Sequence, residues 1–317
     1  MDLTTLAMHE WPVRKAITLS IDDSTWDSEI RERMKRRKWD LGDKVSDANQ
    51  AIDILKSGNA SVLIIEDSSD ISSSILLRQC LYHEITFLRP IIVMISNRTK
   101  THMPSIETMG IPAIIDQPTS PGKFIESFEE LIFKWSTSYY SPIQEPADLI
   151  VKGDSISAIK KLRQLSIDQA LGTIAAPALA LSLEKLNQHK ESERTLLNCL
   201  KSAPNNLGAL LTLMNFYIKS AMPLAAKKVV HKINKIAANP MSILIDQFQC
   251  HLMLNEIDQC IAVLKKINSI PQLSEKSNLL LARCLLSEGR NREYQQLLQF
   301  ISPEDLQKAE CSWGKVS

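Results

Sequence analysis

Carboxylates follow two short apolar runs in the first half of the chain. Asp22 and Asp23 come after "AITLSI", and Glu66 and Asp67 come after "SVLII". Acids that follow apolar runs in this way could form a chemically modified switch. Whether they do depends on the elements that bring them together and on the other side chains at the same place.

Five strand-like runs alternate with amphipathic helical patterns in this half. This alternation predicts a parallel sheet covered by helices on both faces. In an open sheet of that kind, a site lies at the carboxyl ends of the strands. The strands are expected at 16–21, weakly within 39–47, and at 61–65, 90–96 and 112–116, with helices at 25–38, 48–57, 71–83, 102–109 and 121–136.

The remaining strand ends carry Ser96 after the fourth run and Gln117 with Pro118 after the fifth. Together with "ITLSIDDSTWDSEI", "DANQAIDIL", "SVLIIED" and "GIPAIIDQPTSPGKF", this order resembles the receiver domain of two-component response regulators. The resemblance implies a flavodoxin-like, doubly wound, five-stranded parallel sheet. The alternative is another flavodoxin-like domain in which these acids are merely solvated.

Receiver chemistry, as the resemblance implies it, uses two acids and an acceptor aspartate that hold Mg²⁺ while a phosphoryl group is transferred. Asp22 and Asp23 match the two acids, so they are the candidate Mg²⁺ ligands if the receiver is active. A hydroxyl and a lysine before a cis-proline then bind the phosphate. Ser96 lies one residue beyond the hydroxyl position, and Gln117 replaces the lysine before Pro118.

The acceptor position depends on a one-residue register. The family pattern of four apolar residues before the acceptor favours Glu66, whereas Asp67 requires a strand that is one residue longer. Glutamate is a poor acceptor because its longer side chain displaces the carboxyl group, and without a lysine a phosphate on Asp67 would lack its cation. We therefore expect a degenerate pseudo-receiver with no catalytic residues and no cofactor.

The second half repeats every 34 residues. In this register a small-residue position holds Ala158, Ser192, Ala226, Cys260 and Tyr294. Apolar residues recur four and seven positions later. The repeat resembles the tetratricopeptide repeat (TPR), which implies helical hairpins stacked into a superhelix with a concave, protein-binding groove. The groove positions implied by the resemblance are Leu211, Asn215, Ile218, Ile245, Gln249, Leu252, Leu279 and Arg283.

The segment between the halves, "WSTSYYSPIQEP", interrupts the helical pattern and is interpreted as a linker. We therefore predict an N-terminal extension at 1–13, a receiver-like domain at 14–138, a linker at 139–147 and a TPR domain with a capping helix at 148–317. The first 150 residues carry a net charge of −6 and the remainder +7. This asymmetry could favour docking between the halves or an acidic partner.

Composition and motifs exclude several classes of function. The sequence has 44% hydrophobic and 23% charged residues, no apolar run near membrane-spanning length and no basic, apolar leader. Its six cysteines form no C-x-x-C motif, and no phosphate-binding glycine motif or nucleic-acid-binding motif is present. These features predict a cytoplasmic, non-enzymatic protein that binds neither membrane nor nucleic acid.

The resulting hypothesis is a signalling adaptor that binds a protein partner through the TPR groove. The receiver resemblance adds a histidine kinase or another signalling protein as a partner of the first domain, and it is compatible with a homodimer. The alternative is a phosphorylatable response regulator, modified at Asp67 with Mg²⁺ at Asp22 and Asp23, whose output is protein binding by the repeats.

Overall fold

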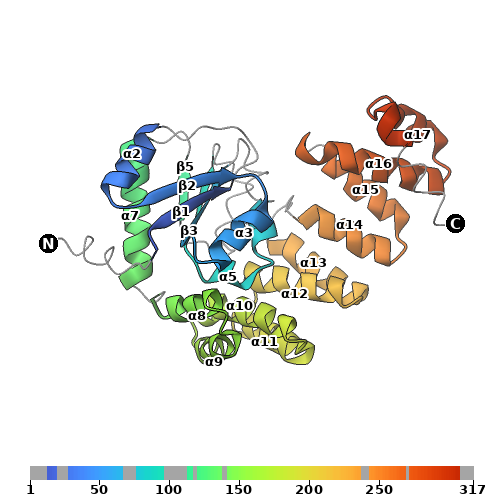
Figure 1. Ribbon diagram of the computed structural model, residues 1–317. Helices are drawn as coiled ribbons and strands as arrows, with labels where there is room; N and C mark the ends of the chain where they lie inside the picture. The colour runs from blue at the N-terminus through green and yellow to red at the C-terminus, as the bar shows by residue number, and fades with distance from the viewer. Residues whose placement is uncertain are drawn as a thin grey trace.

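The protein consists of a parallel sheet with its covering helices, followed by an array of helical hairpins (Figure 1). The hairpins run beneath the sheet and then turn up along its side. This is a computed structural model. It describes residues 13–19, 28–66, 76–95, 113–116, 120–137, 141–236, 243–268 and 271–307.

All neighbouring strands of the five-stranded sheet are parallel, in the order β2-β1-β3-β4-β5. The prediction of five parallel strands is confirmed, including the weak second strand. Apolar side chains of β1 and β3 are fully buried, as expected for strands covered on both faces. The strands are β1 (Lys15–Leu19), β2 (Asp40–Val45), β3 (Val62–Glu66), β4 (Ile91–Ile95) and β5 (Ala113–Asp116).

Helices cover the sheet on two sides. Helices α2 (Ser28–Arg36) and α7 (Pro121–Thr137) pack together. Trp39 and Phe128 meet edge to face beside them, 4.9 Å apart. Helices α3 (Ala48–Lys56) and α5 (Glu84–Phe87) lie on the side that faces the hairpins (Figure 1).

Ten helices of the second part form consecutive hairpins. The second helices of these hairpins begin at 155, 189, 223, 257 and 291, which are steps of 34 residues. The helices are α8 (Ser141–Val151), α9 (Ser155–Leu165), α10 (Gly172–Lys185), α11 (His189–Ser202), α12 (Leu207–Lys219), α13 (Pro223–Ile236), α14 (Leu244–Met253), α15 (Ile257–Ile267), α16 (Pro271–Ser287) and α17 (Asn291–Leu298).

The turn inside each hairpin has the same geometry. Left-handed residues recur at Gly153, Asn187, Ala221, Asn255 and Gly289, with φ between 54° and 78°. At Ala221, for example, the next amide, that of Met222, donates to the Tyr217 carbonyl at 2.8 Å. This bond is the signature of a Schellman motif, which satisfies carbonyl groups at the end of a helix.

The 34-residue packing register is confirmed. Ala158, Ser192, Ala226 and Cys260 are completely buried, and Tyr294 is 8% exposed. Ser192 and Cys260 each contact the first helix of their own hairpin, at Glu184 and Phe248. Small residues in this row permit close approach of the two helices. The polar Ser192 and the bulky Tyr294 are accommodated in the same interior row.

The expectation of an irregular segment at 139–147 is wrong as secondary structure. Helix α8 begins at Ser141 and runs through this segment. Pro142 falls in the first turn, where its missing N–H has no helical acceptor. Pro146 is inside the helix, but it is buried with Ile143 and Ala147, and packing against α9 compensates for the lost hydrogen bond.

The left-handed turns make a stability prediction. Ala221→Gly should raise the free energy of unfolding by about 1 kcal/mol, because an L side chain is disfavoured in this conformation. Gly289→Ala, at the equivalent turn, should lower it by a similar amount. No side chain lies within 4 Å of the added methyl group. Urea denaturation of both variants is the measurement, and a destabilised Ala221→Gly variant would contradict the backbone explanation.

Candidate functional site

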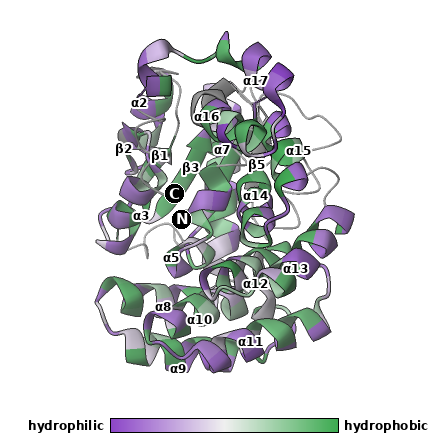
Figure 2. Cartoon of the chain, turned by 90° about the vertical axis from the view of Figure 1, so that its right-hand side faces the viewer, coloured by the Kyte–Doolittle hydropathy of each residue, from purple (hydrophilic) through white to green (hydrophobic). Residues whose placement is uncertain are grey.

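The connection between β3 and β4 lies against the hairpins. We call residues 76–90 the crossover segment. It contains α5, which packs on α10 (Figures 1 and 2). Arg78, Glu84 and Arg89 of this segment are only 4–6% exposed. A buried charge is costly unless it is paired, so the partners of these side chains determine how the crossover segment can sit.

Arg78 pairs with Asp246 of α14. The Tyr82 hydroxyl donates to Oδ1 of the same carboxylate at 2.9 Å, and the Arg78 guanidinium lies 4.7 Å from the centre of the Tyr82 ring. Burial raises the pKa of Asp246, and the nearby Arg78 opposes that rise. The three side chains therefore form one buried unit, which joins the crossover segment to α14, the first helix of the fourth hairpin.

The other two buried charges contact earlier hairpins. Glu84 pairs with Lys185 at the end of α10. An Arg89 guanidinium nitrogen lies 2.8 Å from Asp148 Oδ1 of α8. The crossover segment is thus held by ion pairs to helices of three different hairpins.

A fourth contact lies between the crossover segment and α3. Lys56 Nζ is 3.0 Å from His83 Nδ1. Burial lowers the pKa of His83, and the charge of Lys56 lowers it further. Burial also lowers the pKa of Lys56, and the positive charge of Lys185 lowers it further. The lowered pKa of His83 favours its neutral ring, whose Nδ1 can accept a hydrogen bond from the lysine.

The crossover segment covers part of the groove that the sequence predicted. A Cβ added at Gly208 of α12 would lie 3.0 Å from Phe87 Cε1. Leu211 and Asn215 follow Gly208 on the same helical face and are 2% and 8% exposed. Ile218 is half-buried. This part of the inner face is therefore occupied by the protein itself.

The remaining groove positions are more open. Ile245 and Leu279 are half-buried, whereas Gln249 and Arg283 are exposed, and Leu252 is 48% exposed. These residues lie on α14 and α16, further along the array. A partner at the inner face would meet this part.

The structure places Glu66 as the last residue of β3, where it is half-buried and pairs in register with Met94 of β4. The neighbouring Leu19 of β1 pairs with Ile65. Glu66 therefore lies at the carboxyl edge of the sheet. The other predicted site residues, Asp22, Asp23, Asp67, Ser96, Gln117 and Pro118, lie outside the described residues.

No protein-family model matches the chain, and no curated protein is significantly similar to it. Within the described ranges, no group of three or more His, Cys, Asp or Glu side chains could hold a metal ion. The same ranges contain no helix with the length and apolar character needed to cross a bilayer.

Sequence reasoning missed Arg78, Tyr82 and Asp246. The residue type of Asp246 is unusual for its position in the 34-residue repeat. The equivalent positions of the two preceding hairpins are Ala178 and Thr212, both buried. An aspartate in that row requires a partner from outside the array.

The buried unit makes a second stability prediction. Asp246→Ala should lower the free energy of unfolding by about 3 kcal/mol, because it leaves Arg78 buried without a counter-charge. Asp258→Ala is the control. Asp258 is 81% exposed and makes a long ion pair with Arg290, so its loss should change stability by less than about 1 kcal/mol.

Replacing both Arg78 and Asp246 with apolar residues of similar size tests the effect of their charges separately from the effect of their packing. Arg78→Met combined with Asp246→Leu should recover much of the stability lost in Asp246→Ala, since no unpaired charge remains. Denaturant midpoints of the single and double variants measure this coupling. Equal effects of Asp246→Ala and Asp258→Ala would show that the buried pair does not hold the halves together.

Proposed function

We propose that the chain is a non-enzymatic signalling adaptor, in which a degenerate receiver domain is coupled to a TPR superhelix that binds a protein partner. The observation that carries the proposal is the 34-residue recurrence of helical hairpins with the same left-handed turn. Stacked hairpins of this kind form extended surfaces that suit protein binding. A tetratricopeptide array is the arrangement that this period supports best.

The sheet supports the receiver part of the proposal. Its strand order is that of a flavodoxin-like, doubly wound fold, in which a site lies at the carboxyl ends of the strands. Four buried apolar residues of β3 are followed by Glu66. This placement supports glutamate in the acceptor position, with its carboxyl group one methylene further from the backbone than that of aspartate.

The crossover segment supplies the coupling. It lies between β3 and β4 in the chain and is held against α8, α10 and α14 through its buried charged side chains. A partner that binds the receiver-like part would therefore act on an element already fixed to the hairpins. The open positions on α14 and α16 suit a helix or an extended apolar segment of a second protein.

The impaired switch predicts the response to phosphoryl donors. Incubation of the full chain with acetyl phosphate and Mg²⁺ should produce no phosphoryl mass increase, and beryllofluoride with Mg²⁺ should produce no change in tryptophan fluorescence. Intact-mass spectrometry and fluorescence are the measurements. The physical reason is the displaced carboxyl group of Glu66 together with the loss of a lysine at Gln117.

The matched control is Glu66→Asp combined with Gln117→Lys, which restores the two groups that receiver chemistry requires. We expect this variant to gain a Mg²⁺-dependent response that the natural chain lacks. Stoichiometric phosphorylation of the natural chain, mapped to Asp67, would instead support a working response regulator with protein binding as its output.

A further inference from the structure

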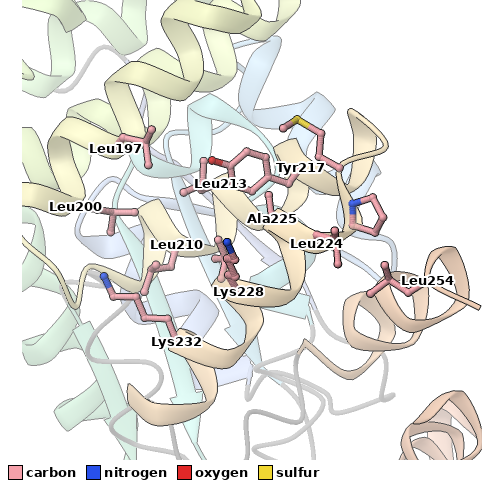
Figure 3. A pocket seen from close by; sticks show the side chains of 13 residues that line it. Leu197, Leu200, Leu210, Leu213, Tyr217, Leu224, Ala225, Lys228, Lys232 and Leu254 are labelled. Carbon is pink, nitrogen blue, oxygen red and sulfur yellow. The ribbon is translucent and has the colours of Figure 1, made fainter. Parts of the chain in front are cut away.

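An apolar groove lies on the side of the array that faces away from the crossover segment. It runs between α11 and α13, with α12 as its floor. We call it the outer groove. Its volume is about 820 Å³, within the range of roughly 300–1,000 Å³ for ligand pockets. Figure 3 shows its side chains. They are Leu197, Leu200, Leu210, Leu213, Tyr217, Met222, Pro223, Leu224, Ala225, Lys228, Val229, Lys232 and Leu254.

At two equivalent places in the array, an ion pair joins the helices. Arg163 of α9 binds Glu191 of α11 through two hydrogen bonds of 2.9 Å. Three repeats later, Lys265 of α15 binds Glu293 of α17 at 2.7 Å. Each of these pairs bridges the second helices of neighbouring hairpins.

One repeat after Arg163 and Glu191, the same two positions are Leu197 and Ala225. A cation and an anion that bridge the helices are thus replaced by two apolar side chains, and both line the outer groove. A pocket of about 630 Å³ occupies the equivalent place one repeat earlier, and Arg163 and Glu191 are among its lining residues. A hollow at this place therefore recurs in the array, and the apolar lining is what distinguishes the outer groove.

The apolar side chains of this groove reach solvent. Leu224 is 68% exposed, Met222 44% and Leu197 40%. A contiguous exposed apolar surface on a soluble domain marks an interaction site more often than isolated apolar residues do. The uncovered leucines therefore favour a bound partner.

The charges at the groove identify the partner's chemistry. Lys228 and Lys232 are its two charged lining residues, and neither has a carboxylate partner among the residues that the structure describes. By contrast, the adjacent Lys227 pairs with Glu256 at 2.6 Å. On the other side, Arg194 and Lys201 lie one turn before and after Leu197 on α11. Glu193 of the same helix accepts a hydrogen bond from the Tyr217 hydroxyl at 2.7 Å. Cationic side chains thus outnumber the acidic one at the two margins.

We propose that the outer groove binds an amphipathic helix of a partner protein, with an apolar face and with Asp and Glu along both of its flanks. The wall from Met222 to Lys232 is about 15 Å long, which matches roughly three turns of a helix. An apolar helix face in a hydrophobic groove is a common recognition mode, and acidic flanks complement the lysines. This inference names a partner class for the proposed adaptor and rests on that function only in the claim that the chain binds proteins.

The test uses the full chain and a synthetic probe. A fluorescein-labelled amphipathic peptide of about four turns carries leucines at i, i+3, i+4 and i+7 with glutamates on both flanks, and a second peptide has lysines in place of the glutamates. Fluorescence anisotropy measures both affinities at low and high salt. We expect the acidic peptide to bind at least about tenfold more tightly, with an affinity that falls as salt screens the charges.

Two double variants locate the binding. Leu197→Arg with Ala225→Glu installs the pair formed by Arg163 and Glu191 one repeat earlier and should replace the apolar wall of the groove with charged side chains. Lys228→Glu with Lys232→Glu reverses the charge of its margin. Each should weaken the acidic peptide at least about tenfold. Lys235→Glu, an exposed change on the same helix but outside the groove, should leave the affinity unchanged, and thermal melts establish that every variant folds.

Four results would overturn the inference. They are no binding of the acidic peptide, equal binding of the two peptides, self-association of the chain that Leu197→Arg with Ala225→Glu abolishes, and binding to phosphatidylserine-containing vesicles in place of the peptide. Loss of peptide binding in Leu252→Ala with Arg283→Ala, but not in the groove variants, would place the peptide on the inner face. That result would overturn the outer-groove site and leave the proposed adaptor function standing.

Discussion

The position of α14 against the crossover segment depends on the buried ion pair between Arg78 and Asp246. Each charge alone would be unfavourable in the interior, and each is tolerated because the other lies against it. Such a pair contributes little net stability compared with apolar residues, but it allows very few relative positions of its two elements. It therefore fixes where α14 lies relative to the crossover segment, while the pairs made by Glu84 and Arg89 fix the preceding hairpins.

This constraint matters because an array of hairpins is otherwise joined only through neighbouring units. Small changes at each interface add up, and the curvature of a free array can vary. Three ion pairs to one short segment restrict that freedom over α8 to α14. Beyond them, α15 to α17 belong to a second, separate apolar cluster that includes Leu264, Leu281 and Leu285. Helices α8 to α14 are thus held by ion pairs to the crossover segment, whereas α15 to α17 are held by the second apolar cluster.

Periodicity made much of this fold predictable. The five strands were visible as apolar runs, and the 34-residue register correctly placed Ala158, Ala226 and Cys260 in the interior. The position of Glu66 at the end of β3 also followed from counting apolar residues. These features depend on local sequence. Buried positions recur every two residues in a strand and every 3.6 residues in a helix, so the spacing of apolar residues predicts them.

The contacts between the halves could not be found in that way. Tyr82 and Asp246 are 164 residues apart, and in a sequence a buried charge has the same appearance as a solvated one. Helix α8 was missed for a related reason, because Pro146 opposes a helix locally and packing against α9 outweighs it. In both cases tertiary structure decides against the local signal.

The repeat nevertheless provides its own reference for long-range contacts. Asp246 stands where Ala178 and Thr212 occur, and it meets the crossover segment. At the next equivalent position, Leu280 of α16 is 42% exposed. Leu197 likewise stands where Arg163 bridges two helices, and it lines the outer groove. A residue whose type differs from those at equivalent positions of the repeat does not make the contact with the next hairpin that they make. Its side chain is then suited to a partner outside the array. For Asp246 that is the crossover segment of the same chain, and for Leu197 it is the partner helix that we propose.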